Sequence, residues 1–149
     1  MMSNIVAIGY GNDLRSDDGI GQCIANQLAH QLQLSNVKSL AVHQLTPELA
    51  EILASADLAI FIDACLASES SQVEVRSLSP DSCGNISGHV ADPRSLLALT
   101  QVLYGNCPTA WWVIVPGENF NLGDRLSPTA KQGIAIALEK IAQIISFQA

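Results

Sequence analysis

The sequence has 149 residues, of which 48% are hydrophobic and only 14% are charged. This length and composition predict one folded domain over residues 1–149 and exclude a disordered tail or linker. Fourteen acidic against seven basic residues give a formal charge of −7, the wrong sign for a surface that neutralises phosphates. The basic residues are scattered singly along the chain, so we expect neither nucleic acid nor an anionic membrane as a partner.

Targeting signals are not evident in the sequence. No apolar stretch approaches the ~20 residues that a membrane-spanning helix needs. Residues 1–4 lack the basic character that begins a secretory signal peptide, and the apolar run behind them is interrupted at once by Gly9 and Gly11. We therefore predict a cytoplasmic protein.

The first half of the chain alternates predicted strands and helices. Residues 4–9 form a short apolar run typical of a strand buried on both faces, which we expect to be the first and central strand. Apolar residues then recur at helical spacing, which predicts a helix that begins after residues 16–19 and continues to about Leu34. Residues 37–45 then form a β-rich run. A short helix follows, with Thr46 as its cap and Pro47 at its first position. Residues 58–63 form a second buried strand.

The second half continues this alternation. Residues 72–78 alternate apolar and polar side chains, which predicts a half-exposed edge strand, with an antiparallel direction as one option. Pro93 begins a predicted helix that Gly105 ends, and residues 109–115 form another apolar strand. A last helix is expected with Ser127 as its cap and Pro128 at its first position. The order predicts an α/β fold: a three-layer sandwich of about five mostly parallel strands with helices on both faces.

Several residues of types that often form sites are predicted to have packing roles instead. Adjacent Trp111 and Trp112 should face opposite sides of a strand. His30 and His43 lie within a predicted helix and strand, which favours structural roles. The four cysteines show no CxxC spacing and are expected to be small buried hydrophobic residues, with disulfides or a zinc site as the alternatives: Cys23, Cys65, Cys83 and Cys107.

The segment after the first strand combines a glycine turn with acidic residues at a helix start. A dinucleotide-binding fingerprint would need glycine at position 14, which is Leu14, and would not place aspartates beside a pyrophosphate. Neighbouring helical side chains diverge by roughly 100°. One of Asp17 and Asp18 can therefore cap the helix while the other points over the strand ends, although simple helix capping by both remains an alternative.

Two further candidates follow other predicted elements. Asp63 ends the second buried strand, at the sheet edge where α/β proteins form their sites. His89 lies in a glycine-rich connection ahead of a helix. Asp18, Asp63 and His89 together would offer two oxygens and one nitrogen to a divalent metal such as nickel or zinc. A serine hydrolase is disfavoured because the sequence has no G-x-S-x-G motif.

Residues 9–21 resemble the signature G-x-G-N-x-L-x-x-D-[DE]-x-x-G of the hydrogenase maturation proteases. The likeness continues through residues 61–64, 87–89 and 126–128, and so covers nearly the whole chain. It implies a single-domain α/β endopeptidase that removes a C-terminal extension from the precursor of a nickel-iron hydrogenase large subunit after nickel insertion. The family's metal-contacting residues correspond to Asp18, Asp63 and His89.

The leading hypothesis is therefore a hydrogenase maturation endopeptidase in which these three residues act at the nickel. We expect the nickel to be presented by the precursor rather than held permanently, and the protease to be a monomer. A non-proteolytic nickel-binding chaperone or sensor of the precursor is the alternative from another class. A metallohydrolase of small molecules with its own zinc is disfavoured, because no HExxH or repeated histidine motif is present.

Overall fold

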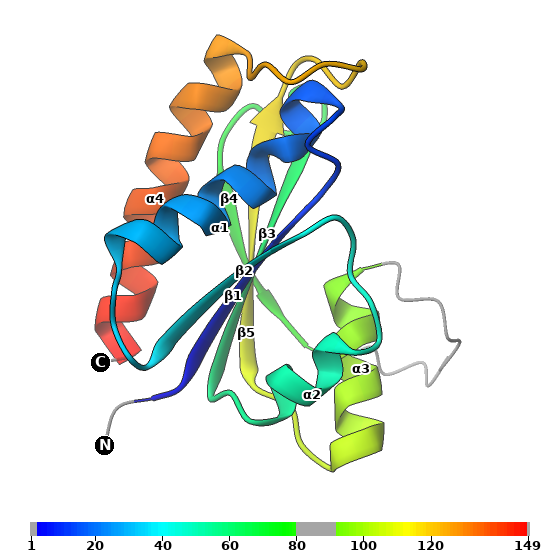
Figure 1. The fold of residues 1–149 in the computed structure, drawn as a ribbon, viewed down its shortest axis with the longest axis vertical. Helices are drawn as coiled ribbons and strands as arrows, with labels where there is room; N and C mark the ends of the chain where they lie inside the picture. Colours follow the sequence, from blue (N-terminus) through cyan, green and yellow to red (C-terminus); the bar gives the residue numbers. More distant parts are fainter. Residues whose placement is uncertain (1–2, 80–91, 149) are drawn as a thin grey trace.

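The structure, a computed structural model, describes residues 3–79 and 92–148. In these residues the chain forms a five-stranded sheet with helices on both sides (Figure 1). The elements in chain order are β1 (Ile5–Tyr10), the 3₁₀ turn η1 (Ser16–Gly19), α1 (Ile20–Gln31), β2 (Val37–Val42), α2 (Leu49–Ala54), β3 (Leu58–Leu66), β4 (Glu74–Leu78), α3 (Pro93–Tyr104), β5 (Thr109–Gly117) and α4 (Pro128–Gln148).

The sheet is mostly parallel, with strand order β2-β1-β3-β5-β4. Strands β1, β2, β3 and β5 run parallel, whereas β4 pairs antiparallel with β5 at the edge. The predicted α/β class and antiparallel edge strand are therefore confirmed. The central position predicted for β1 is wrong by one place, because the chain adds β2 on one side of β1 and then returns to place β3 and β5 on the other.

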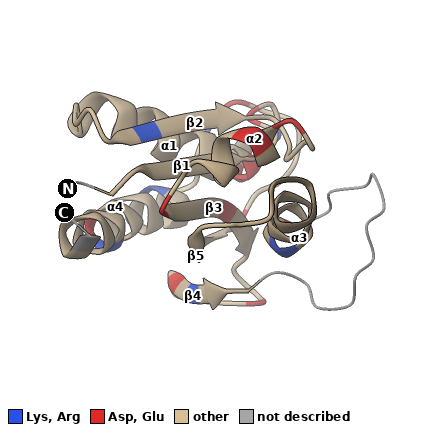
Figure 2. Cartoon of the chain, turned by 90° about the horizontal axis from the view of Figure 1, so that it is seen from below, with Lys and Arg blue, Asp and Glu red and all other residues tan. Residues whose placement is uncertain are grey.

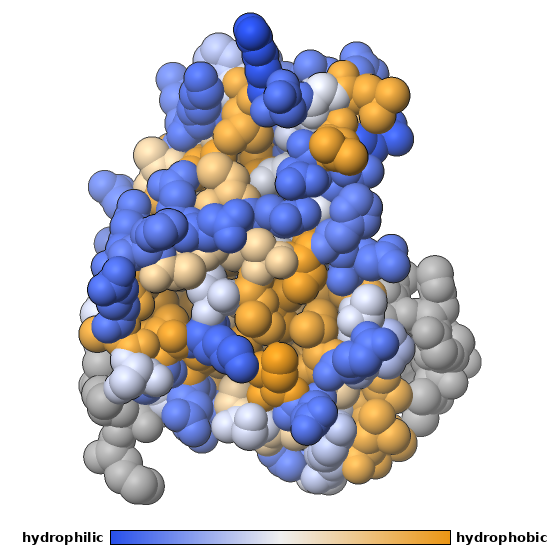
Figure 3. Space-filling view, viewed as in Figure 1, coloured by the Kyte–Doolittle hydropathy of each residue, from blue (hydrophilic) through white to orange (hydrophobic). Residues whose placement is uncertain are grey.

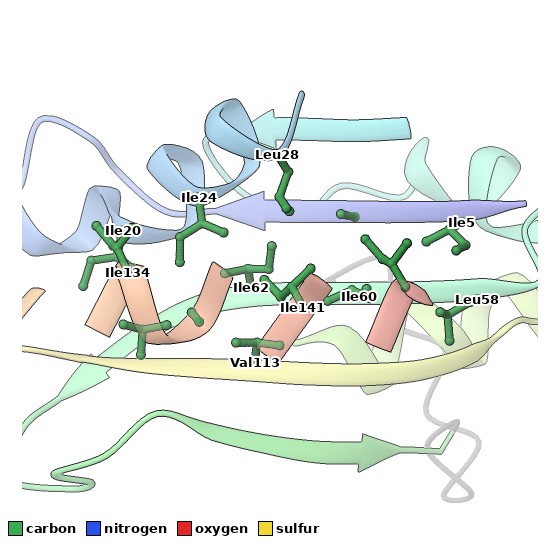
Figure 4. Packing of buried hydrophobic residues seen from close by; sticks show 14 of the residues in the cluster. Ile5, Ile20, Ile24, Leu28, Leu58, Ile60, Ile62, Val113, Ile134 and Ile141 are labelled. Carbon is green, nitrogen blue, oxygen red and sulfur yellow. The ribbon is translucent and has the colours of Figure 1, made fainter. Parts of the chain in front are cut away.

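Two hydrophobic clusters hold the three layers together. Helices α1 and α4 cover one face of the sheet, where Ile24 of α1 and Ile141 of α4 belong to the same cluster as Ile60 of β3 (Figure 4). Helices α2 and α3 cover the other face, as Figure 2 shows end-on. Trp111 packs against the first cluster and Trp112 against the second. The prediction that these two rings face opposite sides is confirmed.

Two helix boundaries differ from those predicted. Helix α1 ends at Gln31 rather than about Leu34, because the chain turns where the Leu34 amide donates to the Leu32 carbonyl. Helix α2 begins at Leu49, and no side chain caps it. Thr46 is therefore not its cap; the Thr46 carbonyl instead accepts the Leu49 amide in the preceding turn.

The ends of the last two helices match the prediction. Asp92 caps α3 by accepting the amides of Arg94 and Ser95, and Gly105 ends that helix in the left-handed conformation with φ of 79°. Helix α4 begins at Pro128, where the Ser127 hydroxyl accepts the amide of Ala130. The capping residues therefore identified these boundaries correctly.

The surface agrees with the low charge of the sequence. In Figure 2 the Lys and Arg segments are separated from one another. Figure 3 shows hydrophilic residues over much of one face with hydrophobic residues between them. No helix in the described residues is long and apolar enough to cross a membrane.

Among these residues the cysteines are free and only partly buried, so the prediction of buried cysteines was wrong for Cys23, Cys65 and Cys107. Cys83 lies outside the described residues.

Glycines let β1, the turn after it and α1 approach closely. A Cβ atom on Gly9 would lie 1.9 Å from the carbonyl oxygen of Gly21 in α1. At Gly11, φ is 144°, and a Cβ atom would lie 2.1 Å from the carbonyl oxygen of Asp18. Only glycine fits either position without moving the backbone. The turn is therefore pressed against the 3₁₀ turn that carries Asp17 and Asp18.

We expect Gly11→Ala to lower the free energy of unfolding by at least about 2 kcal/mol, through backbone strain and the collision with Asp18. Gly105→Ala is the matched control, because Gly105 also has positive φ but nothing lies within 4 Å of a Cβ atom there. Its cost should be about 1 kcal/mol. Urea unfolding measures the free energy of unfolding of both variants. Equal losses of stability would contradict the proposed collision at Gly11.

Candidate functional site

The candidate site lies at the edge of the sheet where the parallel strands β1, β3 and β5 end, toward the top of Figure 1. The loop after β1 and the loop after β5 lie side by side at this edge. The Ser16 amide donates to the Gly123 carbonyl over 2.8 Å, and the Gly123 amide donates to the Leu14 carbonyl over 2.9 Å. Ligands of open α/β sheets bind at this edge.

Asp18 lies on η1 and faces back toward the glycine turn. Its Oδ2 accepts the amide of Asn12 at 2.8 Å. The prediction that one of Asp17 and Asp18 caps the following helix is wrong. The capping positions of η1 and α1 are Arg15 and Gly19, and neither has a side-chain cap. The 3₁₀ turn that precedes α1 was not predicted, and it directs both carboxylates toward other partners.

Asp63 lies within β3 rather than at its end, since the strand continues to Leu66. Its Oδ1 accepts the amide of Ala64 at 2.8 Å, and Tyr10 of β1 lies level with Asp63 on the neighbouring strand. The pKa of Asp63 is raised to about 6, chiefly by burial and also by the charge of Asp18, against the lowering effect of the Ala64 amide and the Tyr10 hydroxyl. The strand is longer than predicted because β5 continues to pair with it beyond Asp63.

Asp18 lies close enough to Asp63 for its charge to raise the pKa of the Asp63 carboxyl. His89, the third predicted site residue, lies outside the described residues. Within residues 3–79 and 92–148, no group of three or more His, Cys, Asp or Glu side chains is arranged to hold a metal ion. His30 and His43 are both exposed, so neither is a core residue.

Asp17 is fully buried and connects the two loops of the site. Its Oδ2 accepts the amides of Glu118 and Asn119 and the hydroxyl of Ser127, while Oδ1 accepts the Ser127 amide, all within 3.1 Å. Burial alone would raise the pKa of Asp17, but these hydrogen bonds together hold it below its ordinary value. Asp17 thus ties η1 to the start of α4, a role that the sequence analysis did not assign to it.

A hollow of about 290 Å³ opens beside Asp63 on the face of the sheet that α2 and α3 cover. Its lining includes Cys65, Glu74, Arg76 and Trp112. Burial raises the pKa of the Cys65 thiol, and the carboxylates of Glu69, Glu74 and Asp63 raise it further. A thiol in such surroundings is a poor nucleophile, because the thiolate is the reactive form.

The sequence analysis missed Tyr10, Cys65 and Trp112 as neighbours of Asp63. Strand periodicity carries part of the signal, because alternate residues of a strand share a face, which places Cys65 with Asp63. Tyr10 and Trp112 belong to other strands, so their proximity depends on the strand order, which a single sequence leaves open.

Solved structures of hydrogenase maturation proteases share this fold. HycI from Thermococcus kodakarensis is 23% identical, with a TM-score of 0.75 over 97% of this chain and 94% of that one. HybD from E. coli is 21% identical, with a TM-score of 0.74 over 96% and 92%. A hydrogenase 2 maturation peptidase from a Thaumarchaeota archaeon is 16% identical, with a TM-score of 0.74 over 96% and 98%. No protein-family model and no curated protein matches the chain.

The chain therefore has the fold of the hydrogenase maturation proteases along nearly its whole length. This is the fold that the resemblance of residues 9–21 implied. The motif and the fold therefore point to the same family of structures. Residues 9–21 span the end of β1, η1 and the start of α1.

We expect Asp17→Ala to lower the free energy of unfolding by about 3 kcal/mol, because buried donors lose a charged acceptor. This exceeds the cost of a lost helix cap, about 1 kcal/mol. Asp57→Ala is the control, since exposed Asp57 accepts only the Asn4 amide among the side-chain hydrogen bonds of the described residues. Urea unfolding at pH 7 measures both variants, and equal losses would contradict the role of Asp17 in joining the loops.

Asp63→Asn should stabilise the protein in a pH-dependent way. The folded pKa of Asp63, about 6, exceeds the ordinary value of 3.8, so its contribution to stability is full below pH 3.8 and is lost as the pH rises through 6. Asparagine keeps the shape without the charge. We expect a gain of about 2 kcal/mol at pH 7 and little change at pH 3.5 in urea unfolding. Equal gains at both pH values would show that the charge is not the cause.

Proposed function

We propose that this chain is an endopeptidase of hydrogenase maturation, which removes the C-terminal extension from the precursor of a nickel-iron hydrogenase large subunit after nickel insertion. One observation carries the proposal. The charge of Asp18 raises the pKa of Asp63, which lies on a separate segment, in a sheet whose fold is that of the hydrogenase maturation proteases. The signature in residues 9–21 supports the same function.

In this proposal Asp18, Asp63 and His89 contact nickel that the precursor presents, so the metal is part of the substrate. Asp18 and Asp63 each use one identified oxygen to accept a backbone amide, Oδ2 and Oδ1 respectively. Those bonds orient the carboxylates while leaving capacity for a cation. Two carboxylates and one imidazole suit a borderline divalent ion, and they are few enough that the precursor supplies the remaining ligands.

Water is the proposed nucleophile. The raised pKa of Cys65 disfavours attack by the thiol nearest to Asp63 in sequence. Nickel in the loaded precursor supplies a positive charge, which polarises a carbonyl or acidifies a bound water. Contacts with the folded precursor then position the scissile bond, which explains how a site with few groups of its own is specific.

The setting follows from the same proposal. The protein acts as a monomer in the cytoplasm, where it meets the folded precursor, and it needs neither nucleic acid nor a membrane. Its net charge of −7 supports the exclusion of phosphate-rich partners.

The proposal is tested by incubating the protein in parallel with nickel-loaded precursor, metal-free precursor and a free peptide that spans the cleavage site. We expect loss of the C-terminal extension, followed by gel mobility and mass spectrometry, only from the loaded precursor. Equal cleavage of both precursors would contradict recognition of nickel but keep the protease. Binding of the loaded precursor without cleavage would favour the chaperone or sensor instead.

Asp18→Ala, Asp63→Ala and His89→Ala should each reduce processing of the loaded precursor by more than about 100-fold, because each removes a metal contact. The controls are Asp57→Ala and His43→Ala, which change the same residue types at exposed positions. Circular dichroism checks that every variant is folded. Processing at the wild-type rate in all three site variants would refute the assignment of the site.

A further inference from the structure

Tyr10 and Trp112 reach toward each other across β3. Tyr10 ends β1, and Trp112 lies on β5, with β3 between these two strands. Both side chains pack against the cluster on the α2 and α3 face. Gly9 pairs with Ile62, so Tyr10 comes level with Asp63, the next residue of β3. The two aromatic rings therefore lie over the part of β3 that carries the Asp63 carboxylate.

A hydrogen bond from Trp112 orients the Tyr10 hydroxyl, which lies beside Asp63. The indole Nε1–H of Trp112 donates to the Tyr10 hydroxyl oxygen over 3.2 Å. Because an indole can only donate, the hydroxyl oxygen must act as acceptor in this bond. The single hydroxyl proton is then free to point toward the Asp63 carboxylate, which lies level with Tyr10 on the neighbouring strand. Trp112 thus determines which way the Tyr10 hydroxyl points.

Groups from two strands approach the Asp63 carboxylate. The Ala64 amide of β3 donates to Oδ1 at 2.8 Å, and the Tyr10 hydroxyl of β1 lies level with the carboxylate. Burial and the charge of Asp63 raise the pKa of Tyr10 above its ordinary value, so its hydroxyl remains a donor at neutral pH. Donors of this kind fix the orientation of a metal-binding carboxylate.

We propose that Tyr10, oriented by Trp112, is a positioning residue that fixes the Asp63 carboxylate for contact with the nickel of the precursor. The inference rests on the proposed function, since it assigns Asp63 a metal contact. Tyr10 itself touches neither the metal nor the scissile bond. Its removal should therefore weaken recognition without abolishing the reaction.

Tyr10→Phe tests the proposal, because it removes the hydroxyl and keeps the ring. We expect kcat/KM for the loaded precursor to fall about 10- to 100-fold, mainly through a higher KM. A purely structural defect would instead lower the active fraction, and thus kcat, at unchanged KM. The matched control is Tyr104→Phe, which changes the other tyrosine of the chain, 47% exposed on α3. It should leave both constants unchanged.

A second readout does not depend on activity. In ¹⁵N-labelled protein, the indole N–H resonance of Trp112 should shift in Tyr10→Phe, because its acceptor is lost. The indole resonance of Trp111, which packs on the opposite face, should stay in place and serves as an internal control. Tyr104→Phe should move neither resonance.

The outcomes separate the two proposals. If the wild-type protein processes the precursor and Tyr10→Phe does so with unchanged KM, the positioning role is overturned while the proposed function stands. An unmoved Trp112 resonance would also overturn it, because the hydrogen bond that orients Tyr10 would be absent. If the wild-type protein does not process the loaded precursor at all, the proposed function itself fails.

Discussion

The site depends on one buried carboxylate that is not itself a predicted metal contact. Asp17 accepts four hydrogen bonds from the segment between β5 and α4. Because a buried charge is costly unless it is fully satisfied, this arrangement tolerates little displacement of either loop. The position of the neighbouring Asp18, one residue further along η1, follows from that constraint. Rigidity at Asp17 thus makes a defined geometry possible at Asp18.

Asp63 shows the opposite balance between stability and function. Its pKa is raised by burial and by Asp18, so its charge at neutral pH destabilises the folded state. A neutral side chain would be more stable at this position, which is typical of residues retained for binding or catalysis. The two adjacent aspartates of η1 therefore differ in purpose: Asp17 is bound to donors of the protein, and Asp18 adds to the unfavourable charge at Asp63.

The sequence predicted most elements because their signals are local. Pro93, Gly105 and Ser127 act through their own backbone neighbourhoods, and the helix ends that they mark are correct. Thr46 is not a helix cap, because its carbonyl accepts the Leu49 amide in a backbone turn before the helix. The assignment of Asp18 and Asp63 to a site stays a prediction. The partners of Asp17 and the position of Tyr10 depend on contacts between distant segments. No local pattern encodes those contacts, and His89 remains a prediction.

The parallel arrangement of β1 and β3 also has a consequence for folding. Parallel neighbours require crossover connections, and long-range pairing of this kind forms late and slowly because the loop-closure entropy is lost before the contacts form. Asp18 follows β1 and Asp63 lies within β3, with α1, β2 and α2 between them in the chain. A partly folded chain in which β3 has not yet paired with β1 therefore does not hold Asp18 near Asp63. Under this topology, the electrostatic coupling between Asp18 and Asp63 appears only when the central strands are assembled.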